Sequence, residues 1–118
     1  MTTYEKGRIA EEKALAYLKK QGLKLVTKNY NCRLGEIDLI MRDKEQLVFI
    51  EVRLRTSIQF GGGIASVTYA KKQKILKAAT YYMLHHQNHD PALRFDVVSI
   101  DGKSASISWI KDAFGMDY

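Results

Sequence analysis

One acidic residue lies inside the most strand-like segment of the chain. Glu51 follows the apolar run Val48-Phe49-Ile50 and precedes Val52, a pattern that predicts a strand covered on both faces. An ionised carboxylate in such a strand is costly unless it meets a metal ion or a cationic partner. Arg53 lies two residues further on and therefore shares a face with Glu51. The spacing leaves two interpretations, a metal ligand or an internal ion pair between Glu51 and Arg53.

The preceding strand-like segment, Glu36 to Met41, repeats the arrangement. Glu36 and Asp38 share one face of this segment. If the two segments form a hairpin, Asp38 approaches Glu51, and the two carboxylates repel each other unless a cation lies between them. Oxygen ligands of this kind suit Mg²⁺ or Mn²⁺, whereas the lack of clustered Cys and His argues against zinc. A turn residue at the end of the strand is the alternative interpretation for Asp38.

A predicted N-terminal helix, from about Tyr4 to Gln21, contributes a third acid. At 100° per residue Glu11 falls within the inward stripe, whereas Glu12 falls outside it. The stripe is formed by Gly7, Ala10, Ala14, Tyr17 and Leu18. Glu11 is therefore a candidate ligand, or alternatively a carboxylate at the rim of the stripe.

A second helix, predicted from about Thr68 to His86, carries lysines near its N-terminus. When the inward face of this helix is extended by one turn toward the N-terminus, it includes Lys72 and has Lys71 at its edge. A lysine near a helix N-terminus can bind a phosphate group, and the free backbone amides at that end of the helix can donate hydrogen bonds to the same group. Lys74 and Lys77 point outward, either toward a nucleic-acid backbone or simply into solvent. The candidate nucleic-acid contacts are Lys71, Lys72, Lys74 and Arg55.

The remaining elements follow from periodicity and from turn residues. Strands are predicted over Leu23 to Tyr30, Glu36 to Met41, Leu47 to Arg53, Arg94 to Ile100 and Ala105 to Ile110. Gly61-Gly62-Gly63 indicates a flexible loop. The resulting order is α-β-β-β-α-β-β, and the helix between the third and fourth strands implies a crossover. We therefore expect an α/β fold with a mixed sheet flanked by helices.

Composition narrows the class of protein. The 118 residues suit one domain over 1–118, and a hydrophobic content of 46% argues against disorder. A net charge of +6 favours polyanionic partners. No stretch approaches the roughly 20 apolar residues of a membrane span, and no signal-peptide core is seen. The single cysteine, Cys32, excludes an intrachain disulfide and suits a reducing compartment, so we predict a cytoplasmic protein.

Several other residues are interpreted as structural. The histidines near the end of the second helix complement its dipole, and no cysteine or acidic cluster completes a zinc site. We expect packing roles rather than metal binding, redox chemistry or base stacking for this set: His85, His86, His89, Cys32, Tyr81, Tyr82 and Trp109.

Six segments taken together resemble a known family. They are Lys6 to Glu11, Gly35 to Ile40, Phe49 to Arg55, Phe60 to Gly62, Ser66 to Thr68 and Arg94 to Val98. Together they resemble the YraN-like family of bacterial proteins over nearly the whole chain. That family is similar to the PD-(D/E)xK nucleases, and especially to archaeal Holliday-junction resolvases.

The resemblance implies a restriction-endonuclease-like core and assigns roles to particular residues. Glu11 matches the acid of the first helix, Asp38 the first metal-binding acid and Glu51 the second. Arg53 occupies the position of the motif lysine, and Lys72 stands where many relatives have a glutamine. The resemblance thus implies a catalytic set of Glu11, Asp38, Glu51 and Arg53, with Mg²⁺ or Mn²⁺ held by the three acids.

Arg53 is the departure from that pattern. A lysine there can orient or help to activate water, whereas arginine keeps its charge and is essentially never a neutral base. The leading hypothesis is a Mg²⁺- or Mn²⁺-dependent endodeoxyribonuclease acting on branched or damaged DNA. The alternatives are a non-catalytic nucleic-acid-binding module and, more weakly, an adaptor for a protein partner. A resolvase would need a symmetric homodimer to cut two strands, but the sequence identifies no dimer face.

Overall fold

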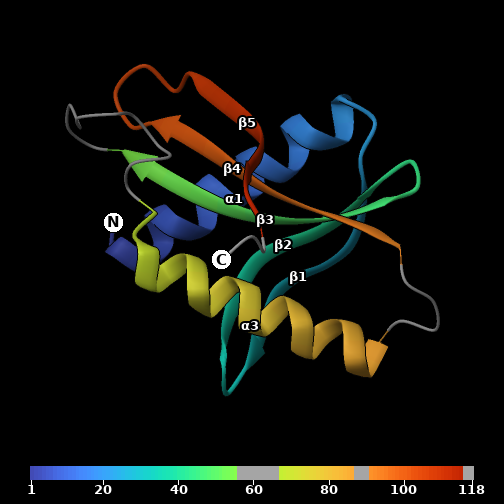
Figure 1. The fold of residues 1–118 in the computed structure, drawn as a ribbon. Coiled ribbons are helices and arrows are strands. Elements are labelled where there is room, and N and C mark those ends of the chain that lie inside the picture. The colour runs from blue at the N-terminus through green and yellow to red at the C-terminus, as the bar shows by residue number, and fades with distance from the viewer. Residues whose placement is uncertain (56–66, 87–90, 116–118) are drawn as a thin grey trace.

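The computed structural model describes residues 1–55, 67–86 and 91–115 (Figure 1). The predicted order α-β-β-β-α-β-β is confirmed. The elements are α1 (Thr3–Lys20), β1 (Lys24–Cys32), β2 (Gly35–Asp43), β3 (Gln46–Arg55), α3 (Tyr69–His86), β4 (Ala92–Asp101) and β5 (Ile107–Phe114). The predicted loop of glycines, Gly61 to Gly63, lies outside the described residues.

Local signals place the ends of α1 where the sequence predicts them. Thr2 Oγ1 accepts a hydrogen bond from the backbone N of Glu5 at 3.1 Å, and Glu5 Oε1 accepts one from the backbone N of Thr2 at 3.3 Å. This reciprocal pair is a capping box, which satisfies free amides at the helix start. Gly22 follows the helix with φ +101°, a conformation that other residues rarely adopt.

The five strands form one mixed sheet in the order β1-β2-β3-β4-β5. The β1–β2, β2–β3 and β4–β5 pairs are antiparallel, whereas β3 and β4 are parallel. A parallel pair needs a crossover connection, and α3 lies within it. This sheet and its element order are compatible with a restriction-endonuclease-like core.

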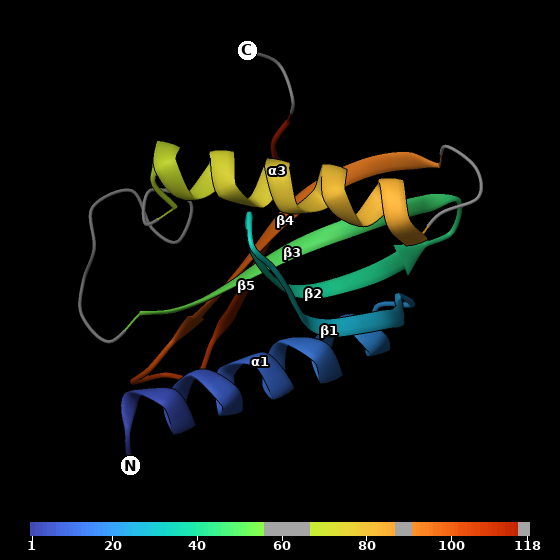
Figure 2. The same cartoon turned by 90° about the horizontal axis from the view of Figure 1, so that it is seen from below.

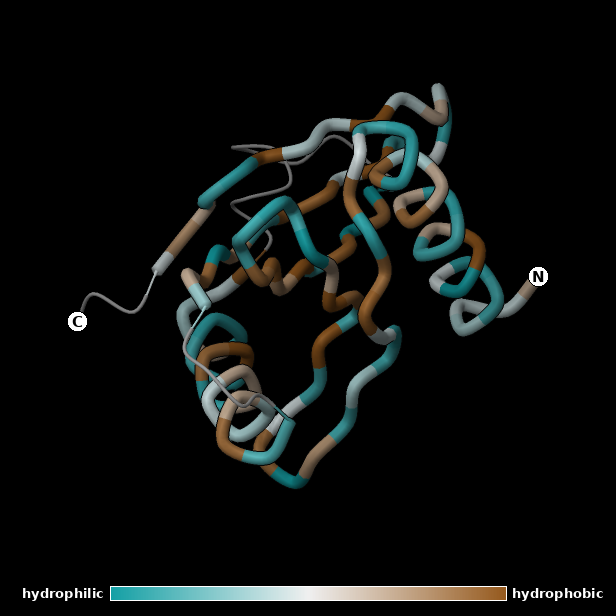
Figure 3. Tube along the Cα trace, turned by 90° about the vertical axis from the view of Figure 1, so that its right-hand side faces the viewer, coloured by the Kyte–Doolittle hydropathy of each residue, from teal (hydrophilic) through white to brown (hydrophobic). Residues whose placement is uncertain are grey.

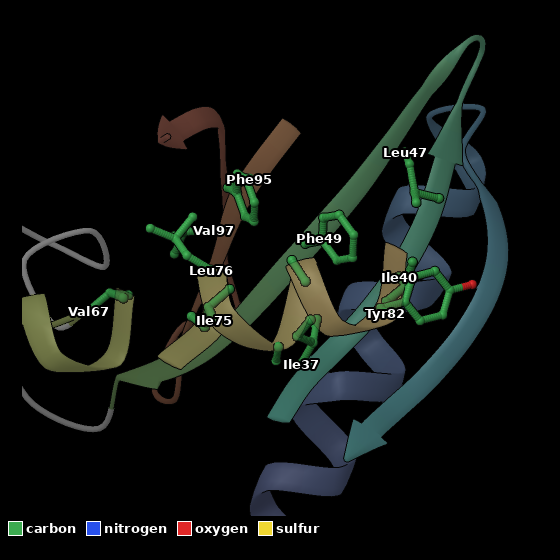
Figure 4. Packing of buried hydrophobic residues seen from close by; sticks show 12 residues of the cluster. Ile37, Ile40, Leu47, Phe49, Val67, Ile75, Leu76, Tyr82, Phe95 and Val97 are labelled. Carbon is green, nitrogen blue, oxygen red and sulfur yellow. The ribbon is translucent and has the colours of Figure 1, made fainter. Parts of the chain in front are cut away.

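The two helices cover opposite faces of the sheet (Figure 2). On the α3 side, Phe49, Phe95 and Tyr82 are among the buried residues that pack together (Figure 4). On the α1 side, Ala10, Ala14 and Leu18 pack against residues of β2, β3 and β4. Figure 3 shows the hydrophobic residues concentrated in the strands between the helices.

The last strand begins two residues later than predicted. Asp101 Oδ1 accepts hydrogen bonds from the backbone N of Lys103 at 2.8 Å and of Ser104 at 3.2 Å. The resulting turn extends through Ala105, whose φ is +61° and whose backbone N donates to the carbonyl of Asp101 at 2.8 Å. The prediction that a strand starts at Ala105 was therefore wrong, because the Asp101 side chain lengthens the turn.

Neither of the helices in residues 1–55, 67–86 and 91–115 combines the length and the apolar character that a membrane crossing requires.

Candidate active site

The site begins where β2 and β3 separate. Backbone pairing between these strands ends at Leu39 and Ile50, so Asp38 and Glu51 would form the next pair in the same register. Instead, Asp38 Oδ2 accepts a hydrogen bond from the backbone N of Val52 at 2.8 Å. The side chain thus satisfies an amide that loses its β2 partner. Asp38 lies well inside β2, so the alternative interpretation as a strand-end turn residue was wrong.

Glu51 lies next to Asp38 in an environment that disfavours its charge. Burial of the Glu51 carboxyl, followed by the negative charge of Asp38, raises its pKa to about 8, although Lys71 and Arg53 act in the opposite direction. Burial also raises the pKa of Asp38, in spite of its hydrogen bond from Val52. Two adjacent buried carboxyl groups of this kind are typical of sites that bind a proton or a cation.

Arg53 is close to Glu51 without fully neutralising it. Arg53 Nη1 lies 3.7 Å from Glu51 Oε1, and the Glu51 side chain is only 12% exposed. Charge-assisted hydrogen bonds between such groups are usually about 2.7–2.9 Å long. The predicted ion pair is therefore present, but it is loose and leaves Glu51 beside a second acid.

Glu11 of α1 is half-buried on the other side of Asp38. Burial and then the charge of Asp38 raise the pKa of Glu11, whereas Arg8 and a hydrogen bond with the side chain of Asn29 lower it. Glu11 thus interacts with Asp38, and Asp38 interacts with Glu51. The structure brings the three predicted acids together, with Asp38 in the middle.

The chemistry of these groups matches a hard divalent cation. Carboxylate oxygens are the ligands that Mg²⁺ and Mn²⁺ prefer. Within residues 1–55, 67–86 and 91–115, no group of three or more His, Cys, Asp or Glu side chains has the arrangement of a ready-made metal site. The donor set therefore fits a cation held chiefly by Asp38 and Glu51, with Glu11 adjacent to Asp38.

Two pockets of about 400 Å³ each open beside the acids. Glu11 and Asp38 line the first pocket, and Glu51 lines the second. Both pockets are also lined by Asn31 and Glu36, so they adjoin each other along the β1–β2 hairpin. The acids are therefore accessible from a continuous concave surface that runs from α1 to α3.

Comparison with known proteins places the chain in a family. The model of the uncharacterised protein family UPF0102 matches residues 10–100. A UPF0102 protein of Legionella pneumophila (strain Corby) is 61% identical over 113 residues, which cover 95% of this chain and 96% of the relative. This chain belongs to family UPF0102. The resemblance to the YraN-like family is thereby confirmed.

More distant relatives match over a similar span. A UPF0102 protein of Psychromonas ingrahamii is 50% identical over 109 residues, covering 92% of this chain and 88% of the relative. One of Nitrosospira multiformis is 47% identical over 119 residues, covering 100% and 99%. The relatives of this UPF0102 chain therefore match it at nearly full length.

The two predicted lysines of α3, Lys71 and Lys72, have different surroundings. Lys71 is the lysine whose charge acts on Asp38 and Glu51, and it lines the Glu51 pocket together with Lys74. Lys72 instead has its Nζ 5.8 Å from the ring centre of Phe114. The buried face of α3 includes Leu76 as well as Ile75, and Lys71 and Lys72 precede these two residues by one turn. Both lysines therefore continue the buried face of α3, and Lys71 is the one whose charge acts on the acids.

Arg55 also lies apart from the acids. It is four residues beyond Glu51, about 13 Å along the strand, and its register partner in β4 is Asp101. Its Nε is buried, and among the residues that the structure describes it has no hydrogen-bond partner. The structure therefore does not bring Arg55 to the three carboxylates.

A glycine brings the β1–β2 hairpin close to α3. A Cβ atom at Gly35 would lie 2.9 Å from the backbone O of Lys74, and the φ of Gly35 is +156°. Any other residue there would force the hairpin away from the helix. Because Gly35 and Lys74 both line the Glu51 pocket, this contact shapes one wall of the site.

Sequence reasoning missed the asparagines of β1. Asn29 interacts with Glu11 and has φ +54°, and Asn31 lines both pockets. Asparagine adopts positive φ more readily than most residues. The available signal was the recurrence of asparagine at positions 29 and 31 within a strand pattern that disfavours it.

The side chains interpreted as structural make packing contacts where they are described. His86 stacks on Tyr82 with ring centres 4.7 Å apart, and His85 lies 4.2 Å from the ring of Tyr81. Trp109 packs edge-on against Tyr17 at 6.3 Å. Cys32 packs against the core on the α3 side, and His89 lies outside the described residues.

Proposed function

We propose that this protein is a divalent-metal-dependent nuclease that hydrolyses phosphodiester bonds in DNA, with branched or damaged structures as its substrates. The observation that carries the proposal is the adjacency of Asp38 and Glu51. Both are largely buried, burial raises the pKa of each, and the charge of Asp38 raises that of Glu51 further. Such a pair is unfavourable in the folded protein unless a ligand, here a cation, offsets the repulsion.

Each residue of the site has a role in this proposal. Asp38 and Glu51 would hold Mg²⁺ or Mn²⁺, with Glu11 as a further acid beside Asp38. When bound, the cation would supply Lewis-acid activation of water and charge neutralisation at the phosphate. Arg53, 3.7 Å from Glu51, stabilises negative charge that develops in the transition state.

The basic residues of α3 extend the site toward the substrate backbone. Lys71 and Lys74 line the pocket that contains Glu51, and phosphate groups are bound by lysines of this kind as point charges. The net charge of +6 further favours a polyanion. Cleavage of both strands of a junction would require two copies of the chain, which a mass measurement on the DNA complex tests.

A second candidate function is nucleic-acid binding without cleavage. Two observations favour it, namely arginine at position 53 and the absence of a ready-made three-ligand metal site among residues 1–55, 67–86 and 91–115. Arginine keeps the positive charge but does not act as a base.

A cleavage assay separates the two functions. Junction, flap, duplex and single-stranded DNA are incubated with Mg²⁺, Mn²⁺ or EDTA, using the wild type, Glu51→Gln and Asp38→Asn. We expect metal-dependent cleavage that falls by roughly a thousandfold or more in both variants. Glu12→Gln is the matched control, because Glu12 is an exposed acid of α1 that lines neither of the two larger pockets beside the acids.

Two results would redirect the proposal. Cleavage that survives in Glu51→Gln assigns the activity to a different site or to a contaminant. Salt-dependent binding to DNA with no cleavage in either metal supports the binding module instead.

A further inference from the structure

A separate pocket of about 430 Å³ lies on the other side of α1 from the acids. It is enclosed by the start of α1, by the ends of β3 and β4 and by the turn between β4 and β5. Figure 2 shows this turn beside the N-terminal end of α1. Its lining residues include Lys6, Ile9, Lys13, Leu54, Ile100 and Lys103.

The helix itself separates this pocket from the acidic site. At 100° per residue, Lys6, Ile9 and Lys13 fall on one flank of α1, whereas Gly7 and Glu11 fall on the other. In the part of the chain that the structure describes, this pocket shares no lining residue with the pocket of Glu11 and Asp38. A ligand bound here would therefore leave the carboxylates free.

The floor of the pocket is aliphatic. Ile9, Leu54 and Ile100 line it, and Ile9 is 38% exposed although it is a large apolar residue. Among the residues that the structure describes, none of the side chains lining this pocket has an aromatic ring. A nucleic-acid base would thus find no ring on which to stack, whereas an aliphatic or aromatic side chain of a peptide could bury apolar surface here.

The rim is positively charged. Lys6 and Lys13 come from α1 and Lys103 from the β4–β5 turn. Asp101, a carboxylate of the lining, already accepts two backbone hydrogen bonds, at 2.8 Å from Lys103 and 3.2 Å from Ser104. In the described parts of the chain none of the three lysines makes an ion pair. The rim therefore offers three cationic groups to a ligand.

We propose that this pocket binds a short acidic peptide segment of a partner protein. One apolar side chain of the peptide is seated on Ile9, Leu54 and Ile100, and its carboxylates pair with Lys6, Lys13 and Lys103. An apolar floor inside a cationic rim is complementary to a peptide in which acidic residues adjoin an apolar one. The partner would thus be held beside the nuclease site without blocking it.

The test uses a fluorescein-labelled probe peptide of sequence Asp-Asp-Glu-Asp-Leu-Phe, with binding to the full chain followed by fluorescence anisotropy at low salt. We expect the double variant Lys6→Glu, Lys13→Glu to lower the affinity by about tenfold or more, because rim charges steer and select partners. Lys19→Glu, Lys20→Glu is the matched control, since these exposed lysines of α1 lie outside the pocket.

A second variant tests the apolar floor. Ile9→Ser should weaken the probe severalfold, whereas Leu84→Ser, which changes an exposed leucine of α3, should not. A probe ending in Ser-Ser in place of Leu-Phe should bind more weakly to the wild type.

The proposal is overturned if the probe does not bind, or if binding is unaffected by the Lys6→Glu, Lys13→Glu pair. It is also overturned if a short duplex DNA or an anionic lipid vesicle displaces the probe through the same lysines more effectively than unlabelled peptide does. None of these results depends on cleavage, because the variants leave Glu11, Asp38 and Glu51 unchanged.

Discussion

Two groups of buried acids lie in this small sheet, and they are stabilised in different ways. Asp96 of β4 is completely buried. Its carboxylate accepts hydrogen bonds from Arg94 Nε at 3.0 Å, Arg94 Nη2 at 2.9 Å, Trp109 Nε1 at 2.9 Å and the backbone N of Asp112 at 3.0 Å. Arg94 Nη1 in turn donates to Asp43 and Gln46, at 2.9 and 2.8 Å. This network leaves little for a ligand to satisfy.

Among residues 1–55, 67–86 and 91–115, Asp38 and Glu51 have no comparable network of donors. Asp38 receives one backbone hydrogen bond, at 2.8 Å from Val52, and Glu51 lies 3.7 Å from Arg53. Each is next to the other, and burial together with this proximity raises the pKa of Glu51. Burial alone therefore does not distinguish Asp96 from the acids of the candidate site. The distinction is whether donors inside the protein already satisfy the carboxylate.

The largest expected effect is the loss of the structural acid. Asp96→Ala removes four hydrogen bonds and leaves Arg94 as a buried cation with a missing partner, which typically costs about 3–5 kcal/mol. Urea unfolding at pH 7 measures the change in the free energy of unfolding. Asp38→Asn, which removes a repelled charge, should change it by about 1 kcal/mol or less. Equal losses in the two variants would contradict the distinction between the two groups.

The next effect is stabilisation by the proposed cation. A ligand that binds only the folded protein contributes about 2.7 kcal/mol at a concentration of 100 times its Kd. We expect Mg²⁺ or Mn²⁺ to raise the Tm of the wild type by roughly 10 °C at such a concentration. Asp38→Asn and Glu51→Gln should lose most of this gain at matched ionic strength. A gain of the same size in both variants would place the cation elsewhere.

A further effect should appear as a pH dependence of stability without metal. The pKa of Glu51 is raised from 4.5 to about 8 in the folded protein. Between these two values the unfolded chain loses the proton that the folded protein keeps, so stability falls as pH rises. Glu51→Gln removes this loss and should be more stable than the wild type above pH 8, by about 5 kcal/mol at most for a pKa difference of about 3.5.

Thermal unfolding of both proteins from pH 5 to pH 9 in EDTA tests this. At pH 5 the two proteins should differ little, because the wild-type carboxyl is then protonated in the folded state. A constant difference across this range would show that Glu51 is already ionised in the folded protein.

Local patterns in the sequence explain why the acids of the candidate site could be selected before their proximity was seen. Glu51 and Asp38 interrupt apolar strand segments, and helical periodicity separates Glu11 from Glu12, so short segments were sufficient to select the three acids. The structure brings these acids together as the predicted β2–β3 hairpin requires. The element order and the mixed sheet follow from the same periodicities.

The structural group could not be predicted in this way, because its partners are distant in the chain. Arg94 and Asp43 are 51 residues apart, and Trp109 reaches Asp96 from the neighbouring strand. Lys71 and Lys72 are adjacent in the sequence, so which of the two side chains lies nearer the acids depends on the exact rotation of α3 over the sheet. The β5 start depended on hydrogen bonds made by the Asp101 side chain rather than on strand periodicity.

The smallest expected effect concerns a glycine beside the acids of the candidate site. Gly7 lies inside α1 and lines the pocket of Glu11 and Asp38, and a Cβ atom there would meet nothing within 4 Å. Because glycine disfavours a helix interior, Gly7→Ala should stabilise the protein by about 0.5–1 kcal/mol. Gly35→Ala is the contrasting control, since its Cβ would lie 2.9 Å from the backbone O of Lys74 and should destabilise the fold. Both are measured by urea unfolding, together with the rate of DNA cleavage.

If Gly7→Ala is more stable but cleaves more slowly, the glycine provides space for the substrate backbone next to Glu11. The lower stability of the wild type would then be the cost of keeping the candidate site open. If cleavage is unchanged, the substrate approaches the acids from the α3 side, past Lys71 and Lys74.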